Sequence, residues 1–136
     1  MSYAVSEALQ AAVFTVLTGD GAVTALVGGH IYDAVPSGAL PGLYIALGEE
    51  KVRDLSSKTG AGALHDLNVD IHSDEPGFQA AKALAAAVCD ALIDTNLTLS
   101  RGSLTNLQFK FARARKGISP DKRVINLTFR ALVSDI

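Results

Sequence analysis

Apolar and polar residues alternate strictly between positions 67 and 72, and this pattern constrains the fold more than any other. Three apolar residues alternate with three polar ones: Leu67, Val69 and Ile71 with Asn68, Asp70 and His72. Such alternation predicts a strand with one buried and one solvated face. A second strand is predicted before it at residues 43–50, where Leu43, Ile45 and Leu47 share one side. Together they predict a long β-hairpin.

A second pair of strands is predicted near the C-terminus. Leu107, Phe109 and Phe111 share one face and are expected in the core, and residues 125–133 alternate in the same way. The connection KGISPDKR contains Pro120 and Asp121, a turn signal. Strands paired as hairpins favour an antiparallel arrangement, so the expected sheet is mainly antiparallel and four-stranded.

Helices are predicted before and between the two hairpins. Residues 4–18 have helical periodicity, and Asp20 can cap a short second helix that ends at Gly28. The segment that begins at Ser73-Asp-Glu-Pro76 predicts a third, alanine-rich helix that reaches Asp94. The fold class is therefore α+β, in the order α-α-β-β-α-β-β, with the helices packed on one face of the sheet. The length of 136 residues favours a single domain, 1–136.

The charge is unevenly distributed along the chain. The net charge is −2, but residues 1–50 hold five acids and no base, and residues 101–136 hold eight bases and two acids. This polarity suits head-to-tail packing of identical subunits or docking on a charged surface. The N-terminus lacks the basic residues of a secretory signal, and no apolar run is long enough to span a membrane, so a cytoplasmic protein without membrane contact is expected.

The glycine-rich stretch at residues 51–64 raises the question of phosphate binding. It reads KVRDLSSKTGAGAL and is expected to be a long loop with three bases, Lys51, Arg53 and Lys58. A phosphate-binding loop precedes a helix, whereas these glycines lead into a strand. We therefore interpret the stretch as a mobile hairpin arm whose bases contact acidic partners.

Metal-ligand and catalytic patterns are weak. His65 and His72 are seven residues apart on a strand and so point to opposite faces, which excludes one shared ion. The adjacent pair Glu49 and Glu50 is separated in the same way, and the single cysteine, Cys89, lies within a predicted helix. We expect no catalytic residue, no metal and no cofactor.

Nucleic-acid binding remains an alternative reading of the basic C-terminal hairpin. Its bases that serve as candidate contacts are Arg113, Arg115, Lys116, Lys122 and Arg123. Bases interleaved with phenylalanines are found in nucleic-acid-binding sheets. The slightly negative net charge argues against such a module. Solvated tips or contacts between subunits explain the bases better.

The order of motifs along the chain resembles that of a family of small prophage proteins. A short helix is followed by Gly-x-Ile-Tyr-Asp, then by a Pro-x-Gly-x-x-Pro segment, a polar strand at 67–73 and a long alanine-rich helix. The matching residues are Gly29, Ile31, Tyr32, Asp33, Pro36, Gly38 and Pro41. On this basis the chain resembles the tail terminators of long-tailed phages and of phage-like gene transfer agents.

The resemblance implies a structural assembly protein. It implies a ring, expected to be a homo-hexamer, that ends the tail tube and joins tail to head. The implied partners are other copies of the chain, the major tail tube protein and the head–tail connector or stopper, and a non-specific contact with DNA in the channel stays open. The implied location is the bacterial cytoplasm during assembly and then the neck of the particle. Another neck protein, for head completion or stopping, is the nearest alternative.

Overall fold

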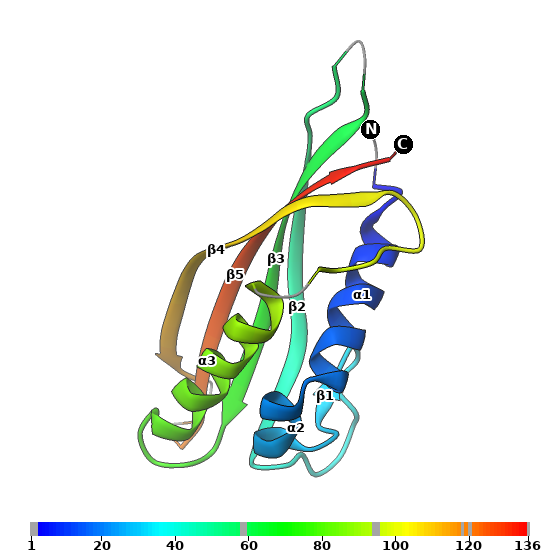
Figure 1. The fold of residues 1–136 in the computed structure, drawn as a ribbon. Coiled ribbons are helices and arrows are strands. Elements are labelled where there is room, and N and C mark those ends of the chain that lie inside the picture. The colour runs from blue at the N-terminus through cyan, green and yellow to red at the C-terminus, as the bar shows by residue number, and fades with distance from the viewer. Residues whose placement is uncertain (1–2, 58–59, 94–95, 118, 120, 136) are drawn as a thin grey trace.

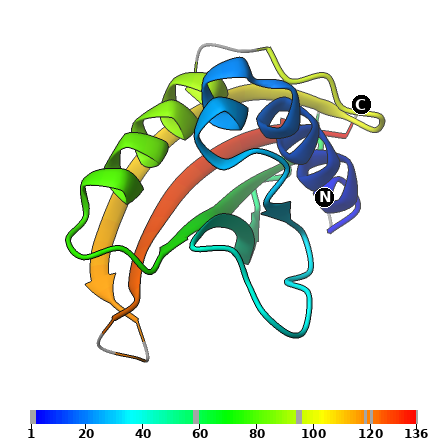
Figure 2. The same cartoon turned by 90° about the horizontal axis from the view of Figure 1, so that it is seen from below.

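The computed structural model describes residues 3–57, 60–93, 96–117, 119 and 121–135. One twisted sheet forms a layer, and three helices cover one of its faces (Figure 1, Figure 2). The helices are α1 (Ser6–Gly19), α2 (Gly21–Val27) and α3 (Gln79–Ile93). The other face of the sheet carries no helix within the described residues, and we call it the open face.

The sheet has five strands, whereas the sequence predicted four. They are β1 (Ile31–Tyr32), β2 (Leu43–Asp54), β3 (Gly62–Ser73), β4 (Ser103–Lys116) and β5 (Arg123–Ser134), in the spatial order β1-β2-β3-β5-β4. The additional strand β1 pairs parallel to β2, with Ile31 opposite Ile45, so the sheet is mixed. Two residues are too few for a detectable alternation, and only the buried Ile31 marks them as part of the layer.

The predicted loop at 51–64 is mostly strand. β2 runs on to Asp54 and β3 begins at Gly62, with Arg53 opposite Leu64. Beyond the strands, the Leu55 amide donates to the Gly62 carbonyl at 2.8 Å. Backbone pairing thus extends the hairpin although its side chains pack little. The β2–β3 hairpin projects past the other strands (Figure 1), and Lys58 lies outside the described residues.

The first two helices form much as predicted. The Asp20 carboxylate caps α2 by accepting a hydrogen bond from the Val23 amide at 3.0 Å. The face of α1 predicted to be apolar is largely buried, with Leu9, Val13 and Leu17 almost fully covered. Since α1 and α2 lie over the sheet, their apolar stripes close one half of the core.

The third helix begins at Gln79, six residues after the predicted cap Ser73. Gly77 has φ of +76°, a left-handed conformation that a helix cannot include, and α3 starts only at Gln79. Ser73 is the last residue of β3 rather than a helix cap. Phe78 consequently lies outside the helix, beneath the guanidinium of Arg123 at 5.7 Å from its ring centre.

Phe109 and Phe111 were predicted in the core, and the structure shows both exposed, by 45% and 59%. The register of β4 slips between them: Phe109 lies opposite Phe129, but Phe111 lies opposite Thr128. This bulge inserts one extra residue and so places the two rings on opposite faces of the sheet. Phe129, fully buried on β5, is the phenylalanine at the centre of the core.

Candidate assembly surfaces

The open face carries a ladder of polar cross-strand pairs on the two central strands. The Arg130 guanidinium donates to the Asp66 carboxylate through Nε at 2.8 Å and Nη2 at 3.2 Å. Thr128 Oγ1 donates to Asn68 Oδ1 at 2.8 Å. Antiparallel strands bring these residues directly opposite one another, so alternation along each strand becomes pairing across the sheet.

The ladder continues to the edge strand β4. Asn126 donates from Nδ2 to Asp70 Oδ1 at 2.6 Å, and Arg115 Nε donates to Asn126 Oδ1 at 2.9 Å. A chain of hydrogen bonds therefore fixes the Arg115 guanidinium against two neighbouring strands.

The electrostatics of the open face favour the ionised form of Asp66. The hydrogen bond from Arg130 holds the pKa of Asp66 below its usual value, against a smaller opposing effect of burial, and the charges of Arg53 and Lys51 lower it further. Burial lowers the pKa of His72, which stacks on Tyr44 with ring centres 4.7 Å apart. The face is therefore polar and charged, but its central charges are already paired.

Four of the candidate contact bases gather on the open face. Lys51 lies opposite Asp66, and Arg53 lies two residues further along β2, on the same face. On β4, Arg113 and Arg115 point to the same face. A hollow of about 490 Å³ separates the two groups, and Lys51, Arg113 and Arg115 line it. The folded chain thus unites bases from two hairpins that the sequence places about sixty residues apart.

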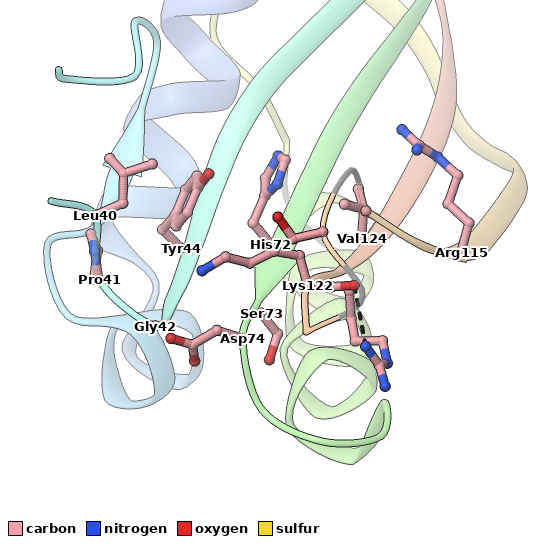
Figure 3. A pocket seen from close by; sticks show the side chains of 13 residues that line it. Leu40, Pro41, Gly42, Tyr44, His72, Ser73, Asp74, Arg115, Lys122 and Val124 are labelled. Carbon is pink, nitrogen blue, oxygen red and sulfur yellow. Dashed lines mark hydrogen bonds between the residues drawn. The ribbon is translucent and has the colours of Figure 1, made fainter. Parts of the chain in front are cut away.

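The other bases lie at the opposite end of the molecule from the β2–β3 tip. Lys122 and Arg123 line a pocket of about 310 Å³ between the β1–β2 connection and the β4–β5 turn. Figure 3 shows Tyr44 and His72 side by side there, with Lys122 extending from the turn toward them. Lys116, at the end of β4, lies opposite Arg123 in the strand register. The candidate bases therefore form two groups rather than one.

A buried polar network joins α1 to the hairpin, and the sequence did not reveal it. Ser6 Oγ donates to Glu50 Oε1 at 2.6 Å, and His65 Nδ1 lies 3.0 Å from Glu50 Oε2. The pKa of Glu50 is lowered, because hydrogen bonds from Ser6, Tyr3 and His65 outweigh the desolvation that would raise it. The only sign of this network in the sequence was His65, which stands at an inward-facing position of an alternating strand where an apolar residue is expected.

The predicted separation of His65 and His72 is confirmed, since His65 is fully buried beneath the helices and His72 lies on the open face. No group of three histidine, cysteine, aspartate or glutamate side chains could hold a metal ion within the described residues. Burial raises the pKa of the Cys89 thiol, which makes it a poor nucleophile. Among the described helices none is long and apolar enough to cross a bilayer alone; only α1 and α2 together reach that length, with a bend of 75°.

Comparison with known proteins identifies the family. Residues 11–134 match the family model of the tail completion protein gp17. Comparison with curated proteins gives no match. The chain is similar to a chain in the solved virion of a native gene transfer agent (GTA) particle, with 53% identity and a TM-score of 0.93 over 98% of this chain and 99% of that one. The chain therefore belongs to the tail completion protein gp17 family, and its role is that of a structural protein in particle assembly.

Proposed function

We propose that this chain forms a hexameric ring that ends the tail tube and joins tail to head. The observation that carries the proposal is the match along almost the whole length to a protein of a gene transfer agent virion. The similarity covers 98% of this chain and 99% of that chain, so it is not confined to one segment of the fold.

The shape of the subunit supports contacts at two ends. The β2–β3 hairpin projects at one end, and the β4–β5 turn with Lys122 and Arg123 lies at the other (Figure 1). A protein that sits between a tube and a head connector needs two such separate ends. We propose that one end meets the major tail tube protein and that the other meets the connector or stopper.

The basic residues are the proposed contacts. Lys51 and Arg53 lie at the base of the projecting hairpin, where they are exposed. We propose that they bind acidic groups of a partner protein, together with Lys58, which lies outside the described residues. Arg113 and Arg115 on the open face are proposed to contact a neighbouring protein or, without sequence preference, the phosphates of DNA in the channel.

The proposed role requires surfaces and no catalysis. A single domain, 1–136, would supply both ends and both lateral edges of each subunit. Assembly would take place in the bacterial cytoplasm, and the finished ring would remain at the neck of the particle.

Removing the protein from a producing cell tests this function. Without the protein, tails are expected to overgrow and to lack heads in electron micrographs. Particles from unmodified cells are expected to contain six copies of the chain, measured by quantitative mass spectrometry. Tails of normal length that fail to join heads would instead favour a head-completion or stopper protein. Tails of normal length joined to heads would refute both roles.

Deleting Ser56–Gly62 tests the proposed contact of the hairpin. The deletion removes the tip but leaves most of the paired strands. Tail length control or head attachment should be lost while the free protein keeps its thermal stability. Unchanged tails and unchanged head attachment would show that the tip contacts neither partner.

A further inference from the structure

The edge strand β4 has the features of a docking surface. It is 14 residues long, it pairs only with β5, and every residue from Gln108 to Lys116 is exposed. Its register is uninterrupted after the second bulge, from Phe111 to Lys116. Unpaired strand edges bind other chains unless something covers or blunts them. The two bulges divide β4 after Leu104 and after Phe109, so residues 111–116 form its longest continuous edge.

Two exposed aromatic rings flank this edge, one on each face of the sheet. Phe109 packs edge-to-face on Phe129, with ring centres 6.0 Å apart, on the helix-covered side. Phe111 lies on the open side and is 59% exposed. Exposed phenylalanines on both sides of one strand are costly in water and are enriched where proteins meet. Lys110, Arg113 and Lys116 make the same strand strongly basic.

The opposite side of the molecule carries a hollow of complementary character. It measures about 670 Å³ and lies beside α1. Its walls include the apolar groups of Tyr3, Phe14 and Leu47, and Tyr3 is 63% exposed. Two carboxylates, Glu7 and Asp33, line the same hollow. Gln10 donates to Asp33, whereas no ion pair holds Glu7 within the described part of the chain.

The two surfaces lie on opposite lateral sides of the subunit. Figure 1 shows the second half of β4, which ends at Lys116, along one side and α1 with β1 along the other. One copy cannot bring them together, but adjacent copies in a head-to-tail arrangement can. A standard interface takes about 800 Å² from each partner, a small part of the 7538 Å² that the subunit exposes. Each subunit can therefore use both surfaces at once.

We propose that the β4 edge of one copy, with Phe111 and Arg113, docks against the α1 hollow of the next copy, with Glu7 and Asp33. This inference rests on the proposed ring and names the surfaces that close it. The partner is a second copy because basic aromatic and acidic apolar surfaces occur on the same chain, on sides that face each other around a ring.

Charge exchange between two variants tests the contact. Arg113→Glu makes β4 repel Glu7, and Glu7→Arg makes the hollow repel Arg113. In particles from cells that make only one variant, the number of copies per particle should fall about tenfold or more, because like charges oppose each other at every contact. When a cell makes both, each interface regains opposite charges in an alternating ring, and the number should recover. Lys82→Glu on α3, an exposed control, should leave it unchanged.

A second measurement does not depend on reversed charges. In a Cys89→Ser background, Glu7→Cys and Arg113→Cys chains should be joined by a short bifunctional thiol reagent only in particles that contain both. The docking is refuted if both single charge variants keep the normal number of copies per particle, or if particles with six copies show no cross-link. Either result leaves the proposed hexameric ring itself intact. Wild-type particles that contain no six-copy ring would refute the proposed function itself.

Discussion

Replacing Glu50 by alanine should test whether the buried network holds α1 onto the sheet. Glu50 accepts from Ser6 Oγ at 2.6 Å and lies 3.0 Å from His65 Nδ1. A carboxylate only accepts, so Nδ1 must carry the proton. His65 is fully buried, and its Nε2 has no hydrogen-bond partner among the described residues. Alanine at position 50 would leave the Nδ1 proton unpaired as well.

The magnitude follows from the hydrogen bonds that Glu50 forms with Ser6 and His65. A hydrogen bond to a charged group contributes about 1.5–3 kcal/mol, and a buried donor without a partner costs about 1–3 kcal/mol. The Glu50 side chain is 14% exposed, so water can replace part of what is lost. We expect Glu50→Ala to lower the free energy of unfolding by about 2–4 kcal/mol, out of a typical total of about 5–15 kcal/mol.

Urea unfolding followed by circular dichroism measures this change. Glu50→Gln, which keeps one acceptor oxygen, should lose about half as much. Glu49→Ala is the matched control, since Glu49 is the exposed neighbour on the same strand. A Glu50→Ala protein that unfolds at the same urea concentration as Glu49→Ala would refute the role of the network.

Three further changes have definite expected outcomes. Because the pKa of Glu50 is lowered in the folded chain from its ordinary value of 4.5, its contribution to stability is complete above that value and is lost as the pH falls through the lower, folded one. In unfolding experiments wild type should therefore lose its advantage over Glu50→Gln progressively below about pH 4.5. Gly102→Ala should lower the free energy of unfolding by about 1 kcal/mol or more, since φ is +73° and a Cβ would lie 2.5 Å from the Ser134 carbonyl oxygen. Gly21→Ala, which meets nothing within 4 Å, is its control and should not be destabilised in the same urea titration. Phe129→Ala should cost about 3–5 kcal/mol, and a cost below 1 kcal/mol by calorimetry would show that Phe129 is not central to the core.

Local chemistry accounts for the parts of the fold that sequence reasoning predicted correctly. Period-two alternation in β3 and β5 requires one buried face, and the Asp20 cap acts on an amide three residues away. Both signals are contained in a few neighbouring residues. They therefore predicted the central strands, the first two helices and the separation of His65 from His72.

Features that depend on distant parts of the chain could not be predicted in this way. The pairing of Ile31 with Ile45 adds β1 to the sheet, although the segment alone is only two residues long. The bulge in β4 moves Phe111 away from the core, while its sequence still alternates with Lys110 as if both phenylalanines were buried. Register is set by the partner strand, and the sequence of one strand does not contain it.

An α+β fold class, an acidic first part, a basic last part and motifs resembling those of tail terminators follow from the amino-acid sequence alone. The fold brings Lys51, Arg53, Arg113 and Arg115 onto one open face. It also places the α1 hollow, which Glu7 lines, on the other side of the subunit from the second half of β4, which carries Arg113. The positions of these charges depend on the fold because strand pairing and helix packing bring together residues far apart in the chain. Charge composition is a local property, whereas a binding surface is a property of the fold.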